Sequence, residues 1–358
     1  MNKRTFLLAL ASLPAWRIPA ADAVAFAPVR PGHVLRFPFD HGAHPAFRTE
    51  WWYATGWLRL PDGQPLGFQS TFFRVRSGIG EQNPSAFAPR QLILAHAAIA
   101  DPRLGRLRHD QRSARAGFGR AGFETGKTGV WIDDWRFAQR DDHYQASVRG
   151  ADFSYALLLV PDGPPLRHGN AGFSVKAPDP RHASYYYSRP QLRASGTVTL
   201  DGRTQAVTGD AWLDHEWSST LLPENAQGWD WAGLNFNDGS ALMAFRLRGL
   251  EASPVWSAAT FRPAGGPAQV LPPEAVSFEP LRHWRSARTG ITYPVEWRIR
   301  IGARQLELTP LFDDQELDSR RSTGAVYWEG AVRVTEGRRE IGRGYLEMTG
   351  YGERLRVG

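Results

Sequence analysis

The chain has 358 residues, of which 42% are hydrophobic, and a formal net charge of +7. That length allows two domains of ordinary size, each with its own core. There is no cysteine, which excludes disulfides and a cysteine-linked lipid anchor. Most of the 43 basic residues are scattered arginines, so the charge is typical of a solvated surface and we expect no nucleic-acid partner.

The first 23 residues have the organisation of a secretory signal peptide. Lys3 and Arg4 form a basic start, residues 6–16 (FLLALASLPAW) are apolar, and residues 21–23 (ADA) form a small-x-small cleavage site. The apolar stretch is too short to span a bilayer, which takes about 20 residues. We therefore expect a soluble mature protein that is periplasmic or secreted and begins after Ala23.

Beyond the leader, the hydrophobic pattern has a period of two, which is typical of β-strands. Aromatic and β-branched runs follow one another at residues 49–60, 64–76, 128–137, 151–160, 194–200, 240–248, 295–301 and 325–334. Asp-Gly turns and frequent prolines separate them. We predict an all-β fold of antiparallel barrels or sandwiches with little helix, and a long loop over the Pro- and Gly-rich residues 253–273.

Two of the predicted hairpins resemble each other. Laying residues 53–68 on residues 229–244 places Tyr53 on Trp229, and Asp62-Gly63 on Asp238-Gly239. Either the halves arose by duplication, or two Asp-Gly hairpins match by chance. In both cases we expect each half to open with an aromatic-rich hairpin.

The first of these strands holds a carboxylate among aromatic residues. Alternation places Glu50 and Trp52 on one face, toward a barrel interior, and Trp51 and Tyr53 on the other. On a structural interpretation, Glu50 accepts hydrogen bonds from an arginine or from indole groups and closes the barrel end. On a functional one, it contacts a ligand or transfers protons with a raised pKa. Some of His41, His44, His96 and His168 converge on the same barrel mouth, or these histidines are surface and capping residues of turns and loops.

Residues 209–217 (GDAWLDHEW) carry the second concentration of polar groups. As a strand they put His215 and Trp217 on one face, and Asp214 and Glu216 on the other. His215 is either a satisfied core histidine or a functional group. One strand face cannot supply three ligands from Asp214, His215 and Glu216, and no HExxH or CxxC motif occurs, so we expect no metal site. The sequence also lacks dinucleotide, P-loop and GxSxG signatures, and we expect no cofactor.

Several motifs recur in order from about residue 38 to residue 352: DHGAHPAFRTEWWYATGWL, HGNAGFSVKAP, YYYSRPQL, GDAWLDHEWSS, GWDW, YPVEWRI, DDQEL, YWEGAV and GYLEMTGY. Together they resemble the lipocalin-like family that contains the AttH proteins and that is similar to the carotenoid 1,2-hydratases. The resemblance implies two tandem lipocalin-like antiparallel β-barrel domains, here residues 24–219 and 220–358.

The resemblance also implies a site. Carotenoid hydratases carry a His-x-Trp implicated in activity, which corresponds to His215 and Trp217. Hydration of an isoprenoid double bond needs a proton donor in a dry pocket and an aromatic face toward the carbocation. His215, Asp214 or Glu50 would donate the proton, and Trp217 and Trp231 would face the cation.

Export argues against a biosynthetic enzyme, because carotenoids are made at the cytoplasmic membrane. A barrel lined with aromatic residues suits an apolar or amphipathic ligand, such as an isoprenoid or lipid, and the AttH-like branch is associated with exporter-type ABC systems. We therefore expect a periplasmic ligand-binding or accessory protein, with a cofactor-independent hydratase as the alternative and a purely structural partner of a membrane complex as the third. The candidate ligand contacts are Trp52, Tyr53, Trp229 and Trp231, and Glu50 and His215 are predicted to line one cavity near the joint of the barrels.

Overall fold

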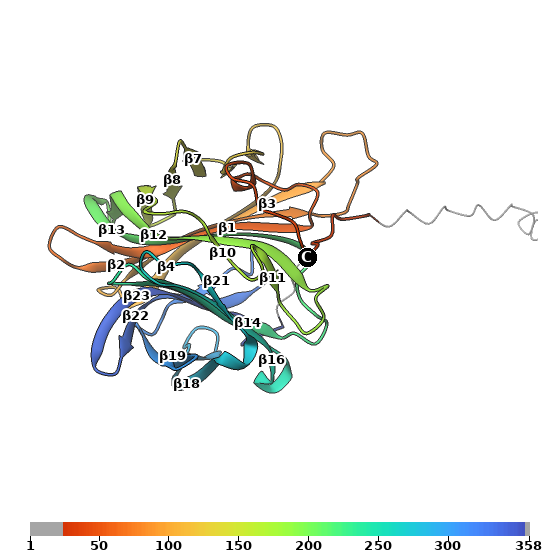
Figure 1. The fold of residues 1–358 in the computed structure, drawn as a ribbon. Coiled ribbons are helices and arrows are strands. Elements are labelled where there is room, and N and C mark those ends of the chain that lie inside the picture. The colour runs from red at the N-terminus through yellow and green to blue at the C-terminus, as the bar shows by residue number, and fades with distance from the viewer. Residues whose placement is uncertain (1–23, 355–358) are drawn as a thin grey trace, which may run out of the picture.

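The computed structural model describes residues 24–354, which form two antiparallel β-sheets packed against each other (Figure 1). The predicted signal peptide lies outside the described residues. Within them, helical geometry is confined to three short 3-10 segments: η1 (Phe39–His41), η2 (Leu250–Ala252) and η3 (Pro273–Ala275). The all-β prediction is confirmed. No helix in residues 24–354 has the length and apolarity to cross a membrane.

The first sheet has 13 strands, and its main path runs in the order β4-β3-β2-β1-β13-β12-β9-β8-β7-β6-β5. The strands are β1 (Thr49–Arg59), β2 (Pro65–Arg76), β3 (Gln91–Asp101), β4 (Arg106–Arg115), β5 (Ala121–Phe123), β6 (Gly129–Ile132), β7 (Trp135–Arg140), β8 (His143–Arg149), β9 (Phe153–Val160), β10 (Leu166–Arg167), β11 (Phe173–Val175), β12 (Ala183–Leu200) and β13 (Arg203–Thr220).

The second sheet has ten strands, and its main path runs in the order β17-β16-β15-β14-β23-β22-β20-β19-β18. They are β14 (Gly228–Phe236), β15 (Ala241–Arg248), β16 (Pro254–Arg262), β17 (Gln269–Leu271), β18 (Val276–Arg285), β19 (Thr292–Ile301), β20 (Arg304–Pro310), β21 (Glu316–Asp318), β22 (Val326–Glu336) and β23 (Arg339–Met348). The chain passes from the first sheet to the second between Thr220 and Gly228. Whether the predicted segments 24–219 and 220–358 fold as separate domains stays a prediction.

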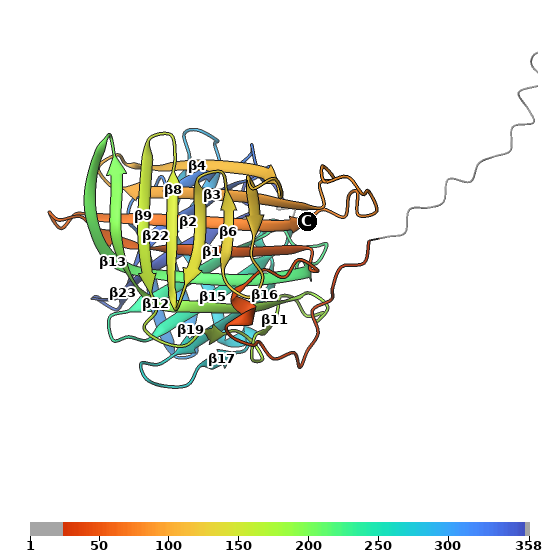
Figure 2. The same cartoon turned by 90° about the horizontal axis from the view of Figure 1, so that it is seen from above.

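The first sheet curls into a nearly closed barrel, whereas the second is open. Strand β6 approaches β3 and β4 at the far edge of the first sheet without a ladder between them. Figure 2 shows β6 to β9 lying across β1 to β4, with the long strands β12 and β13 bending from one layer to the other. Gly209 allows β13 to approach β1 closely, because a Cβ there would collide with the carbonyl oxygen of Trp57.

Alternation along the strands divides the apolar residues into three layers. One set fills the barrel and includes Trp52, Ala54 and Leu58 of β1. A second fills the concave side of the other sheet. The opposite face of β1, with Tyr53 and Trp57, packs between the two sheets. The predicted assignment of Trp52 and Tyr53 to opposite faces is therefore confirmed.

Each sheet opens with the predicted hairpin. Strand β1 pairs with β2 around Asp62-Gly63, and β14 pairs with β15 around Asp238-Gly239. The prediction of a loop over residues 253–273 is wrong, since β16 and β17 lie within it. The aromatic and β-branched content of residues 254–262 outweighs the prolines and glycines around them, and Pro254 occupies the first position of its strand, where it is tolerated.

Candidate functional site

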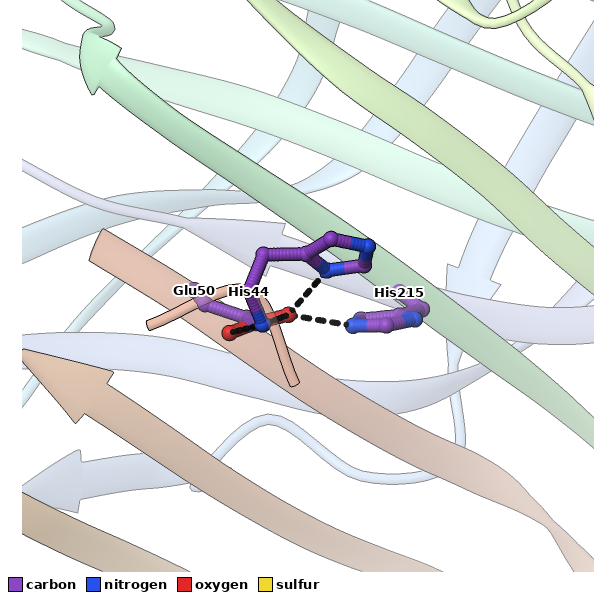
Figure 3. A group of neighbouring side chains, drawn as sticks. All are labelled: His44, Glu50 and His215. Carbon is purple, nitrogen blue, oxygen red and sulfur yellow. Dashed lines mark hydrogen bonds and ion pairs between the residues drawn. The ribbon is translucent and has the colours of Figure 1, made fainter. Parts of the chain in front are cut away.

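Glu50 and His215 come together at one end of the barrel. In the ladder of β1 with β13, Trp52 is opposite His215 and Glu50 is opposite Trp217. The side chains of all four residues therefore lie on the same face of the sheet. The Nε2 atom of His215 lies 2.9 Å from Oε1 of Glu50. Figure 3 shows His44 reaching the same carboxylate from the segment that precedes β1.

The carboxylate of Glu50 is fully buried, and donors from three other residues, His215, His44 and Arg74, surround it. Nδ1 of His44 lies 2.8 Å from Oε1, and the backbone N–H of His44 donates to Oε2 at 2.9 Å. Nε of Arg74 donates to Oε2 at 2.7 Å. Burial alone would raise the pKa of Glu50, but the charges of Arg74 and His44 and the hydrogen bonds hold it well below its ordinary value. Glu50 is therefore a carboxylate, as the structural interpretation requires, and not a proton donor.

The pKa values of the two histidines beside Glu50 shift in opposite directions. Burial disfavours a protonated His44, but Glu50 and Asp40 outweigh it and raise its pKa. Burial lowers the pKa of His215 despite the hydrogen bond to Glu50. A neutral His215 donates from Nε2 to Glu50 and accepts at Nδ1 from Tyr187, whose oxygen lies 3.1 Å away.

Aromatic rings hold the cluster in place. The ring of Trp52 stacks on His215 at a centroid distance of 4.7 Å, and Trp217 stacks on His44 at 3.7 Å. His41 also joins the cluster, with Nδ1 2.7 Å from the Tyr187 oxygen. Of the two alternatives left open for the histidines, convergence on one barrel mouth therefore holds for His41 and His44, whereas His96 lines the inter-sheet cavity.

His44, Glu50 and His215 are also a potential metal-binding group, because one donor atom of each lies within 4.8 Å of the others. The surroundings do not fit a cation. The Arg74 guanidinium is 2.7 Å from Glu50 and fully buried, and a divalent ion on the same carboxylate would face its positive charge at close range. The donors and acceptors of the trio are already matched in one hydrogen-bonded network, which suits an ion-pair cluster better than a metal centre.

Two hollows flank this cluster. Trp217, His44 and Asp40 line one of about 590 Å³ at the barrel end. Glu50 also lines a cavity of about 310 Å³ between the two sheets. His215 lines neither of them.

The inter-sheet cavity is built from the outer faces of β1, β2 and β3 and from strands of the second sheet. Its aromatic lining consists of Trp51, Tyr53, Phe73, Trp229 and Tyr327. A smaller pocket of about 60 Å³ adjoins it, shares Trp51, Tyr53, Trp229 and Glu347, and adds Trp231, Tyr186 and Asp214. Of the four predicted ligand contacts, Tyr53 and Trp229 line the cavity and Trp231 lines the smaller pocket, whereas Trp52 lies in the barrel core.

Asp214 belongs to this second site and not to the His215 cluster. Its carboxylate accepts hydrogen bonds from Tyr186 at 2.7 Å, from Trp212 at 2.6 Å and from the hydroxyl of Ser188. Burial raises its pKa to about 7 even though these donors favour the charged form. Tyr186 also accepts from the indole N–H of Trp231 at 3.0 Å, which links Asp214 to that ring.

Two further acids in the cavity were missed from sequence. Glu329 of β22 and Glu347 of β23 are direct cross-strand partners and both line it. Burial and the charge of Glu347 raise the pKa of Glu329 well above its ordinary value, and burial raises the pKa of Glu347 to about 8. The signal was present, since both lie in motifs quoted above, YWEGAV and GYLEMTGY.

Arg74 was also not identified from the sequence, although the register of the β1–β2 hairpin places it opposite Glu50. The turn at Asp62-Gly63 pairs Arg59 with Pro65, and counting nine residues further from the turn along each strand places Arg74 opposite Glu50. The arginine that the structural interpretation of Glu50 calls for was therefore identifiable from the turn alone.

The fold and the site define a class of protein: two packed β-sheets with an aromatic- and acid-lined cavity between them. This chain belongs to the AttH-like family, whose model matches residues 28–351. The AttH part of the predicted resemblance is confirmed. A comparison with curated proteins found no match.

Solved structures show the same architecture. A crystal structure of an AttH candidate from Nitrosomonas europaea is 52% identical and superposes with a TM-score of 0.86, covering 91% of this chain and 100% of that one. Kievitone hydratase from Nectria haematococca is 14% identical, with a TM-score of 0.68 over 91% of this chain and 96% of its own. CghA with Sch210972 is 16% identical, with a TM-score of 0.53 over 87% and 89%. The last two likenesses are of fold alone.

Proposed function

We propose that this protein binds an apolar or amphipathic ligand in the cavity between its two sheets. The cavity itself carries the proposal: about 310 Å³ of space lies under five aromatic side chains contributed by both sheets. Aromatic walls with a few polar groups are the usual lining of small-molecule sites. The rigid strands on both sides hold this space open, because each wall is fixed by a ladder of backbone hydrogen bonds.

We further propose that the protein acts outside the cytoplasm, as an accessory to an exporter-type ABC system. The support is the leader-like organisation of residues 1–23 and the association of AttH-like proteins with such systems. In this role the protein would hold a poorly soluble molecule rather than transform it.

Mass spectrometry of organic extracts of the purified protein tests ligand binding. Leu94 lines the cavity from β3, and a Leu94→Trp variant fills it. Leu281→Trp is the matched control, because Leu281 is an exposed residue of β18. We expect a co-purifying apolar molecule from the native protein and from the control, and none from Leu94→Trp. Equal recovery from all three would contradict the proposal.

A second candidate function is hydration of an isoprenoid double bond. The observation that supports it is the environment of Asp214. A carboxyl whose pKa is about 7 is partly protonated at neutral pH, and it is linked through Tyr186 to Trp231, an aromatic face for a carbocation. Asp214 would transfer its proton to one alkene carbon. Water would then add to the other carbon and return a proton to the carboxylate.

Incubation with a carotenoid in ¹⁸O-labelled water tests this second function. A hydratase would yield an alcohol that carries the label, and Asp214→Asn would abolish the product while leaving ligand retention intact. Absence of labelled alcohol with a carotenoid that demonstrably binds would exclude carotenoid hydration.

A further inference from the structure

The inter-sheet cavity is lined by two acids that form no salt bridge among the described residues: Glu329, which is buried, and Glu347, which is half-buried. Glu329 and Glu347 are opposite each other on neighbouring strands, which places their Cβ atoms about 5 Å apart. Glu329 is 1% exposed, and neither of its carboxylate oxygens has a hydrogen-bond partner among the described residues. Glu347 accepts one bond from the indole N–H of Trp229 at 3.1 Å. The hydroxyl of Tyr53, which lines the same cavity, also makes no hydrogen bond of ordinary geometry within residues 24–354, but it and the hydroxyl of Tyr327 lie near enough to the Glu329 carboxyl to lower its pKa in part.

The cations near this pair are already engaged elsewhere. Arg74, at one end of the cavity, is held by Glu50 at 2.7 Å. Lys176, in the smaller pocket, is held by Glu216 at 2.8 Å. His96 is the third basic group of the lining, and burial lowers its pKa to about 3, so its ring is neutral.

The remaining charges around the pair are negative. Asp214 and Glu216 of β13 act on Glu347 from the side of the smaller pocket. In this setting two carboxylates at close range cannot both ionise while the cavity is empty, and the pair retains protons. An anionic ligand would add to the same repulsion.

We propose that the cavity recognises an amphipathic cation: an organic ammonium head seated at Glu329 and Glu347, with its apolar tail against Phe73 and Leu94. This inference rests on the proposed ligand-binding function. The ammonium replaces the protons of the acid pair and supplies the positive charge that the cavity lacks. Trp51, Tyr53, Trp229 and Tyr327 surround the same space and present ring faces or edges to the head group, and ring faces attract cations.

Calorimetric titration with three probes, each built on a chain of eight carbons, tests the charge preference. The probes are octyltrimethylammonium, 1-octanol and octanoate, which are cationic, neutral and anionic. The variants are Glu329→Gln and Glu347→Gln, with Glu340→Gln as the control, because Glu340 is an exposed residue of the same strand as Glu347. Glutamine is close to glutamate in size and its side-chain oxygen can still accept the Trp229 indole N–H at position 347, so both variants are expected to fold, and circular dichroism checks this.

We expect the native protein and the control to bind the ammonium at least about tenfold more tightly than the alcohol, which corresponds to 1.4 kcal/mol. In both cavity variants the two affinities converge, and the affinity for octanol stays as it is in the native protein. Octanol or octanoate binding as tightly as the cation would overturn this inference and leave ligand binding standing. Failure of all three probes to bind would overturn both.

Discussion

Replacing Glu50 by glutamine tests the role of the buried ion cluster. The change leaves the Arg74 guanidinium fully buried without its carboxylate and deprives His44 of its closest negative partner. Removing one member of a buried ion pair costs about 3–5 kcal/mol. Arg74 keeps three neutral acceptors, the carbonyls of His44 and Phe47 and the side chain of Gln91, so the lower end applies. We expect a loss of about 3 kcal/mol, or roughly 4 °C in Tm for a chain of this length.

Urea unfolding at pH 7, followed by tryptophan fluorescence, measures this loss. Glu336→Gln is the control, because it breaks the exposed Arg304–Glu336 pair, which is worth about 0–1 kcal/mol. The lowered pKa of Glu50 means that its contribution is complete above its ordinary pKa of 4.5 and is lost as the pH falls through the lowered value. A Glu50→Gln variant as stable as the control at pH 7 would refute the structural role.

Three further predictions follow from the charges and the leader. The pKa of Glu347 is raised from 4.5 to about 8, so the folded state binds this proton more tightly than the unfolded chain, and the resulting stability is complete below pH 4.5 and is lost as the pH rises toward 8. Glu347→Gln should therefore gain stability relative to the native protein over that range in urea titrations, and a constant difference would contradict the assignment. Added Zn²⁺ should leave the Tm unchanged, because Arg74 occupies the carboxylate of the His44–Glu50–His215 trio, and a rise in Tm that His215→Ala removes would show a metal site instead. N-terminal sequencing of the exported protein should begin at Val24, whereas a retained Met1 would contradict cleavage after Ala23.

The fold could be predicted because period-two alternation is a local property. The faces of β1 follow directly from the sequence, since Trp52 and Tyr53 can only point to opposite sides of an extended chain. The curvature of the first sheet could not be predicted from the sequence in this way. Its near closure brings β6 beside β3 and β4, and a contact between strands so far apart in the sequence is not visible in local alternation.

The site was predictable in part for the same reason. Alternation separated His215 from Asp214, and the structure places them in different clusters. Alternation could not show that His215 meets Glu50, because that contact joins strands 165 residues apart in sequence. Glu329 and Glu347 pair within the hairpin of β22 and β23, where a register shift at Val334 hides the pairing from a count along the sequence. Their place in the cavity depends on the packing of the second sheet against the first.

The central claim is that the ligand lies between the sheets, and photo-crosslinking tests it most directly. An alkyl probe with a diazirine group would be bound to the purified protein and irradiated, and the labelled peptides would be mapped by mass spectrometry. We predict labels on lining residues such as Phe73, Leu94 and Trp229, with loss of labelling in Leu94→Trp. Labels confined to the barrel-end hollow around Trp217, or spread over exposed residues and unaffected by Leu94→Trp, would contradict the claim.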